Sequence, residues 1–174
     1  IYFLRFSDSG SIIQSDLRVT NELFHSRFPN LHWNGSQYLL LWMDARVTGN
    51  GGAEVYTRVI NSSGQLLGNE NRITNTYGNA LLGSVSLNQN KNEYLLAWTD
   101  QLNDPTYPKL YTVIINTLGE KIGAEKNMTP MGDVKNYPYI ITYNDTVKPF
   151  YLIWAQFGSN SKYNLFYSPC NSSG

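Results

Sequence analysis

This chain contains little cysteine and little charge, and it has no long apolar run. Cys170 is the only cysteine, which excludes an internal disulfide framework and a cysteine-rich zinc site within the chain. Only 15% of the residues are charged, and 13 basic residues balance 13 acidic ones. Because nucleic acids and anionic membrane surfaces attract a positive patch, neither is expected as a partner. No apolar stretch approaches the ~20 residues of a membrane-spanning helix, so direct membrane insertion is not expected.

The motifs that hold cofactors, phosphates and metals are also missing. The sequence has no Gly-rich phosphate loop, no His-Glu-x-x-His motif and no Asp-rich calcium loop. His25 and His32 are the only histidines, and without a third ligand candidate nearby they do not support a zinc site. We therefore expect no cofactor, no metal and no catalytic residue in this chain.

What the sequence does contain is an internal repeat of about 55 residues. Trp42, Trp98 and Trp154 end apolar runs and stand 56 residues apart. Three further features recur at nearly the same spacing. They are a tyrosine (Tyr2, Tyr56, Tyr111, Tyr167), a turn glycine (Gly10, Gly64, Gly119) and a triplet that closes each unit (18–20, 72–74, 127–129). New units begin near Pro29, Gly83 and Pro138. Self-similarity at a fixed period of this length predicts a repeat architecture.

Each repeat has the pattern of four short strands joined by turns. No window sustains the helical spacing of apolar residues, so helix should be nearly absent. In the middle unit we expect strands at about residues 81–87, 93–99, 110–115 and 121–128. The second of these is apolar at nearly every position, which indicates a strand buried on both faces between stacked sheets. Four-stranded antiparallel units repeated around an axis predict an all-β fold of the β-propeller type.

The expected propeller region spans residues 1–174, and its first and last units are expected to be incomplete blades. Residues 1–28 form the end of a blade, 29–82 and 83–137 form full blades, and 138–174 form a partial blade. This division makes thirteen strands, which is not a multiple of four. Since an unpaired edge strand invites association, we expect a longer parent protein, and the assembly of several copies is the alternative.

The chain also resembles a known family of repeats. Residues 33–46 combine an Asn-Gly turn, the strand Tyr-Leu-Leu-Leu-Trp and a following Asp and Arg, and residues 55–68 add a Val-Tyr-Thr-Arg strand and a Gly-x-x-Leu-Gly turn. This pattern resembles the repeat of secreted bacterial β-propeller proteins. The resemblance implies a propeller fold and a surface, envelope or binding role. The last unit departs from the pattern, because Gln156 stands where the other units have an Asp.

Candidate binding residues follow the second strand of each unit. In a propeller the loops after the second and fourth strands share one face, and variable loops on a rigid repeat are typical recognition sites. The candidate contacts on this face are Asp44, Arg46, Asp100, Tyr107 and Phe157. An alternative role for Asp44 is to accept hydrogen bonds from its own loop and orient Arg46. For the repeated tryptophans, sugar stacking and packing between blades both stay open.

The sequence thus predicts a non-enzymatic interaction scaffold, a protein-binding subunit or module of a bacterial envelope or extracellular assembly. A carbohydrate-binding propeller lectin is the first alternative, and a fragment of a propeller hydrolase is the second. Residues 7–10, Ser-Asp-Ser-Gly, match the Asp box of sialidase-type propellers only in part. The neutral, Asn-rich and Tyr-rich surface with one thiol favours an extracytoplasmic location, secreted, periplasmic or at the cell surface.

Overall fold

The computed structural model of the protein describes residues 1–46, 52–76, 78–101, 108–129, 135–143, 145–157 and 162–171. These residues form strands and turns without any helix, so the described part of the chain holds no helix long and apolar enough to cross a membrane. The strands are β1 (Tyr2–Phe6), β2 (Ile12–Arg18), β3 (Ser26–Trp33), β4 (Gln37–Asp44), β5 (Glu54–Asn61), β6 (Leu66–Arg72), β7 (Ala80–Asn88), β8 (Glu93–Asp100), β9 (Lys109–Asn116), β10 (Lys126–Asn127), β11 (Lys135–Thr142), β12 (Phe150–Phe157) and β13 (Tyr163–Cys170).

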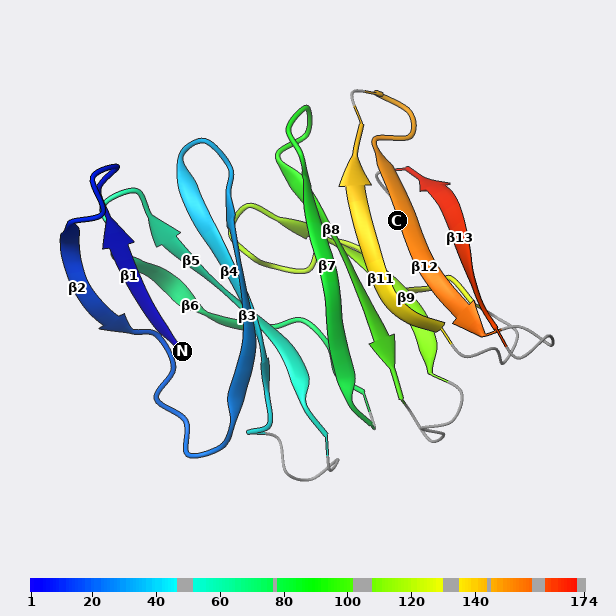
Figure 1. The fold of residues 1–174 in the computed structure, drawn as a ribbon, viewed down its shortest axis with the longest axis horizontal. Helices are drawn as coiled ribbons and strands as arrows, with labels where there is room; N and C mark the ends of the chain where they lie inside the picture. The colour runs from blue at the N-terminus through cyan, green and yellow to red at the C-terminus, as the bar shows by residue number, and fades with distance from the viewer. Residues whose placement is uncertain are drawn as a thin grey trace.

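The strands form four antiparallel sheets in chain order. Sheet 1 contains β1 and β2, sheet 2 contains β3 to β6, sheet 3 contains β7 to β10, and sheet 4 contains β11 to β13. Within each sheet the strands pair in sequence order, as expected for meandering four-stranded units. Figure 1 shows the four sheets side by side from blue to red, with β3, β7 and β11 along the same side. The described residues form a row of sheets and no closed ring.

Three apolar clusters fill the spaces between successive sheets. The middle strands β4 and β8 alternate their side chains between two clusters, because successive residues of a strand point to opposite faces. Leu95 and Ala97 of β8 pack toward sheet 4, whereas Leu96 and Trp98 pack toward sheet 2. All four of these side chains are fully buried. This two-sided burial is the reason that the second strand of each repeat is apolar throughout.

The triplet that closes each unit completes the hydrogen bonding of the third strand. The Thr74 hydroxyl accepts the N–H of Val55 at 2.9 Å, and the Thr129 hydroxyl accepts the N–H of Leu110 at 3.0 Å. One residue earlier in each triplet, a backbone N–H donates to the carbonyl of the same third-strand residue. The recurring threonine therefore satisfies a buried backbone donor where the ladder ends.

The landmarks Pro29, Gly83 and Pro138 mark β-bulges inside the first strand of each unit. The pairing register shifts at each of them, and the strands begin three residues before the expected unit boundaries. Proline is tolerated in a strand at a bulge, where its missing N–H breaks no ladder bond. A Cβ at Gly83 would lie 2.2 Å from the Pro138 ring, so the first strands of sheets 3 and 4 approach closely there.

Two expectations from the sequence are wrong in detail. The strand expected at 121–128 is only the two-residue β10 with an isolated bridge from Lys121 to Ile115, because the chain between them leaves the ladder at a bulge. The tyrosine series also ends on a different residue. Trp154 pairs and stacks with Phe166, as Trp42 does with Tyr56, whereas Tyr167 points to the opposite face and is 74% exposed.

Candidate functional site

Four of the five expected site residues lie at the end of the sheets where β4, β8 and β12 end, which is the lower end in Figure 1. Asp44, Asp100 and Phe157 are the last residues of β4, β8 and β12, so sheets 2, 3 and 4 carry one each at this end. Arg46 follows β4 by two residues. Tyr107 lies outside the described residues. The first strands β3, β7 and β11 begin at the same end, which we call the loop end.

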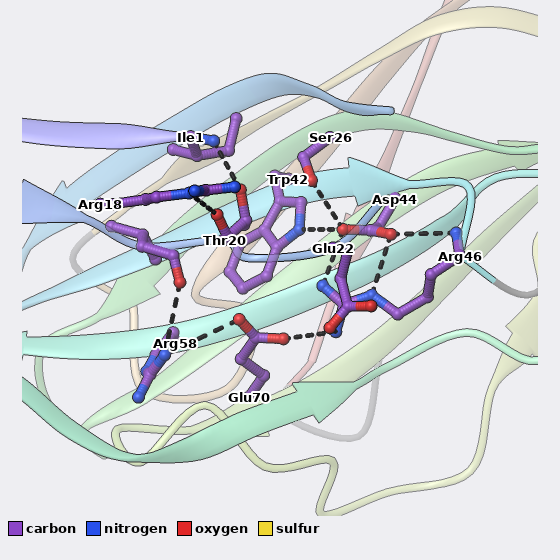
Figure 2. Close-up of polar contacts among 11 residues, drawn as sticks. Ile1, Arg18, Thr20, Glu22, Ser26, Trp42, Asp44, Arg46, Arg58 and Glu70 are labelled. Atoms are coloured by element: carbon purple, nitrogen blue, oxygen red, sulfur yellow. Dashed lines mark hydrogen bonds and ion pairs between the residues drawn. The ribbon is translucent and has the colours of Figure 1, made fainter. Parts of the chain in front are cut away.

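Asp44 is fully buried and accepts hydrogen bonds from three neighbours (Figure 2). Its carboxylate accepts the Ser26 hydroxyl at 2.9 Å and the Trp42 indole N–H at 3.0 Å. Arg46 donates its backbone N–H at 3.0 Å, Nε at 2.9 Å and Nη2 at 2.7 Å. Burial alone would raise the pKa of Asp44, but the hydrogen bonds from Arg46, Trp42 and Ser26 outweigh it and lower the pKa to about 2. The carboxylate is therefore ionised in the folded protein at neutral pH.

Arg46 extends this pairing to neighbouring elements. Its Nη1 lies 2.5 Å from Glu70 of β6 and 3.3 Å from Glu22 of the loop before β3. The guanidinium also sits over the Tyr56 ring, 4.4 Å from its centroid. Burial lowers the pKa of Arg46, but its bonds to Asp44 and Glu70 raise the pKa by more. Only 17% of the side chain is exposed, so its donors are directed inward.

These contacts give Asp44 and Arg46 a structural role at the loop end. They join the end of β4 to β6 and to the loop that enters β3. This agrees with the alternative role of Asp44, in which it accepts hydrogen bonds from its own loop and orients Arg46. Asp100 takes the matching place in sheet 3 and is 2% exposed. Phe157 differs from both, because it is 43% exposed and packs edge-on against Tyr163 at 5.1 Å. Direct ligand contact by these residues stays a prediction.

The repeated tryptophans are packing residues in sheets 2 and 3. Trp42 and Trp98 have no exposed surface, so neither ring offers a face to a sugar. They stack on Tyr56 and Tyr111 at centroid distances of 6.0 and 5.7 Å. The two differ in one bond, because the Trp42 indole N–H donates to Asp44, whereas the buried Trp98 indole N–H has no acceptor in the described structure.

Replacing each tryptophan by phenylalanine should separate that hydrogen bond from the packing. Both changes remove a similar buried area, but only Trp42→Phe removes a hydrogen bond to a charged group. We expect Trp42→Phe to lower the free energy of unfolding by about 1 to 2 kcal/mol more than Trp98→Phe. Urea denaturation of the two variants measures the difference. Equal losses would show that the indole bond to Asp44 adds nothing to stability.

The structure also reveals an open cleft at the loop end, between the beginnings of β3 and β7. Its volume is about 170 Å³. The lining residues come from sheets 2 and 3 and are His25, Arg27, Phe28, Met43, Ala53, Asn79 and Leu81. Asn79 is held in place, since its side-chain oxygen accepts the N–H of Ala53 at 2.9 Å. The Arg27 side chain is exposed and forms no ion pair or hydrogen bond within the described part of the chain, so its guanidinium donors are available to a ligand.

Phe28 presents an aromatic ring at this cleft from a strained backbone. Its φ is 53°, a left-handed conformation that bulky residues rarely adopt, and its side chain is 63% exposed. The residue lies in the β-bulge of β3. A bulge residue with a left-handed backbone is usually glycine. Such strain persists only where the surrounding structure enforces it and is often found at binding sites. Sequence patterns did not identify this residue, because Phe-Pro carries no binding signature by itself.

The cleft is lined by the aromatic ring of Phe28, by the side chains of His25 and Arg27, and by the fixed amide of Asn79. Such a set can pack against the apolar face of a ligand while Arg27, His25 and Asn79 bind its oxygen atoms. Within the described residues, no three His, Cys, Asp or Glu side chains are grouped so as to hold a metal ion. The arrangement therefore fits an oxygen-rich organic ligand.

Comparison with known proteins gives a likeness in fold alone. No protein-family model matches the chain, and no curated protein matches it. Among solved structures, the chain is similar to the endo-arabinase from Bacteroides thetaiotaomicron VPI-5482, with a TM-score of 0.56 and 16% sequence identity. The alignment covers 84% of this chain and 56% of that chain. The chain thus spans little more than half the length of the arabinase.

Proposed function

We propose that this chain is part of a β-propeller and acts as a non-enzymatic binding module whose loop end binds an extended carbohydrate. The observation that carries the proposal is the cleft at the loop end, which is lined by the exposed Phe28, by Arg27 with its free guanidinium and by the fixed Asn79 amide. Aromatic faces pack against the C–H faces of sugars, and side chains of this kind bind sugar hydroxyls.

The propeller part of the proposal rests on the repeat and on the fold likeness. Sheets 2 and 3 are complete four-stranded meanders that stack in chain order, and the aligned structure is similar over 84% of the chain. A row of such sheets curving around an axis is the propeller arrangement. In this arrangement the ion pairs of Asp44 and Arg46 stabilise the loop end on which the cleft is built.

The experiment is a binding titration of the chain with defined oligosaccharides, including arabinan fragments. We expect saturable binding that falls at least tenfold in Phe28→Ala and Arg27→Ala, while the matched surface variant Asp8→Ala binds normally. Binding that is unchanged in both cleft variants would refute the cleft as the site. If the chain binds no oligosaccharide but captures protein partners that free sugars do not release, the result would instead favour the protein-binding scaffold of an extracytoplasmic assembly.

Phe28 itself gives a prediction that separates binding from stability. Phe28→Gly relieves the left-handed backbone, whereas Phe28→Ala keeps a Cβ in that conformation. Phe28→Gly should therefore be about 1 kcal/mol more stable than Phe28→Ala in urea denaturation. Both variants lose the ring, so both should lose carbohydrate binding to the same extent. A less stable Phe28→Gly would contradict the strained backbone.

A glycoside hydrolase is the second candidate, and the likeness to a protein named endo-arabinase favours it. Hydrolysis requires a pair of carboxyl groups placed on either side of the scissile bond. The release of reducing ends from the bound oligosaccharide tests this candidate directly. Binding without turnover supports the module proposed here. Turnover that persists in Asp8→Ala but is lost in Phe28→Ala and Arg27→Ala would favour the hydrolase instead.

A further inference from the structure

The open edge of β1 borders an apolar groove on the surface of sheet 2. Figure 1 shows β1 and β2 alone at one end of the row of sheets. The groove has a volume of about 240 Å³ and is lined by Tyr2 and Leu4 of β1 together with Pro29, Leu31 and Leu40 of sheet 2. Among the described third strands, β5, β9 and β13 each pair with a second strand, and β1 does not.

The backbone of β1 is ready to accept a strand on that edge. The Ile1 carbonyl accepts the N–H of Val19 at 2.9 Å, on the side of β2. Because successive residues of a strand direct their backbone groups to alternate sides, the N–H and C=O groups of Tyr2 and Leu4 face the open edge. The edge therefore offers two donors and two acceptors beside an apolar groove.

The packing of the other sheets indicates what fills this groove. Each sheet presents a pair of facing apolar residues, one on its first strand and one on its second, to the sheet before it. In sheet 3 this pair is Val85 and Leu96, which pack with Leu39 and Leu41 of β4. In sheet 4 it is Ile140 and Leu152, which pack with Leu95 and Ala97 of β8.

Leu31 and Leu40 are the equivalent pair in sheet 2, where Leu40 is buried at 3% exposed but no second strand packs over Leu31. They face each other across β3 and β4 as the other pairs do. Leu31 is 44% exposed, whereas the matching Val85 and Ile140 are each 3% exposed. Tyr2 is likewise 62% exposed, whereas the matching Tyr56 stacks on Trp42 and is 6% exposed. The Leu31 position is covered by a second strand of the preceding sheet in sheets 3 and 4, and the Tyr2 position carries a tryptophan of the paired second strand in sheets 2 and 3.

We propose that the groove beside β1 binds a further apolar strand of the Tyr-Leu-Leu-x-Trp type, which pairs antiparallel with β1. The occupant belongs to another repeat unit of this kind rather than to a second copy of this chain, because the matching strands β4, β8 and β12 are already paired on both sides. Its tryptophan stacks on Tyr2, and its leucines cover Leu31. The proposal depends on the packing between repeats and not on the carbohydrate site at the loop end.

The test uses the full chain and a labelled peptide with the sequence of residues 93–100. Fluorescence anisotropy should show saturable binding, and hydrogen exchange should show protection of the Tyr2 and Leu4 amides. The control peptide carries Asp in place of Leu95, which faces the groove in the expected complex. In the chain, Leu31→Asp should weaken binding at least tenfold and shift the urea midpoint only slightly, because Leu31 is 44% exposed.

A tethered form keeps weak affinity from hiding the site. The same strand, joined ahead of Ile1 by a flexible Gly-Ser linker, has an effective concentration in the millimolar range. It should raise the unfolding midpoint of the chain and protect the same two amides. Failure of both forms, equal binding of the control peptide, or protection along β13 instead of β1 would overturn the proposal. Self-association of the chain that protects β1 without peptide would also overturn it, in favour of a second copy.

Discussion

Asp44→Ala should destabilise the chain by about 3 to 5 kcal/mol, because it removes the buried carboxylate that accepts hydrogen bonds from Arg46, from the Trp42 indole N–H and from the Ser26 hydroxyl. Arg46 would keep Glu70 and Glu22 as partners, but its contacts to β4 would be lost. Urea denaturation measures the change. Asp8→Ala, at an exposed acid, is the matched control and should stay within about 0.5 kcal/mol of the unchanged chain.

Two further variants show whether the loss comes from an unpaired charge. The double change of Asp44 and Arg46 to alanine should cost less than the sum of the single changes, because neither charge is then left without its partner. Asp44→Asn keeps the shape of the side chain but removes its charge. Strict additivity of the single changes would contradict the ion pair between Asp44 and Arg46 as a source of stability.

The same carboxylate predicts how stability varies at low pH. The pKa of Asp44 is about 2 in the folded chain, below the ordinary value of ~3.9 for an unfolded aspartate. A lowered pKa in the folded state stabilises the fold above the unfolded value, and this contribution is lost as pH falls toward 2. The stability difference between the unchanged chain and Asp44→Asn should therefore shrink between about pH 4 and pH 2.

Ile140→Ala should lower the free energy of unfolding by about 2 to 5 kcal/mol. Ile140 is 3% exposed and packs with Leu95 and Leu152 in the cluster between sheets 3 and 4. Its removal leaves a cavity that the two close-packed sheets cannot collapse to fill. The measurement is the midpoint of urea unfolding at constant m-value.

Leu31→Ala is the matched control for Ile140, because it removes a leucine at the same position of sheet 2. Leu31 is 44% exposed, so its loss should cost less than about 1 kcal/mol. The contrast between the two variants measures how much one sheet gains from the strand packed over it. Equal costs at the two positions would mean that Leu31 is covered in solution.

The candidate site is formed by contacts between sheets that the sequence pattern does not predict. Asp44 and Arg46 drew attention as an acidic and a basic residue after an apolar strand, and the structure directs both inward. The cleft at the loop end has no sequence signature, because His25 and Arg27 come from the entry to β3 and Asn79 from the entry to β7. Residues so distant in sequence become neighbours only through the packing of sheets 2 and 3.

The sequence by itself determined the repeat, the all-β class and the order of the strands, because these follow from local turn chemistry and from the two-residue period of strands. Gly64 and Gly119 have the left-handed backbone that their turns require, and Leu96 is buried as its apolar strand predicts. The tertiary structure alone decided the pairing of Trp154 with Phe166, the shortness of β10 and the strain at Phe28. These features depend on bulges and sheet-to-sheet contacts, which shift a register by one or two residues without leaving a periodic trace in the sequence.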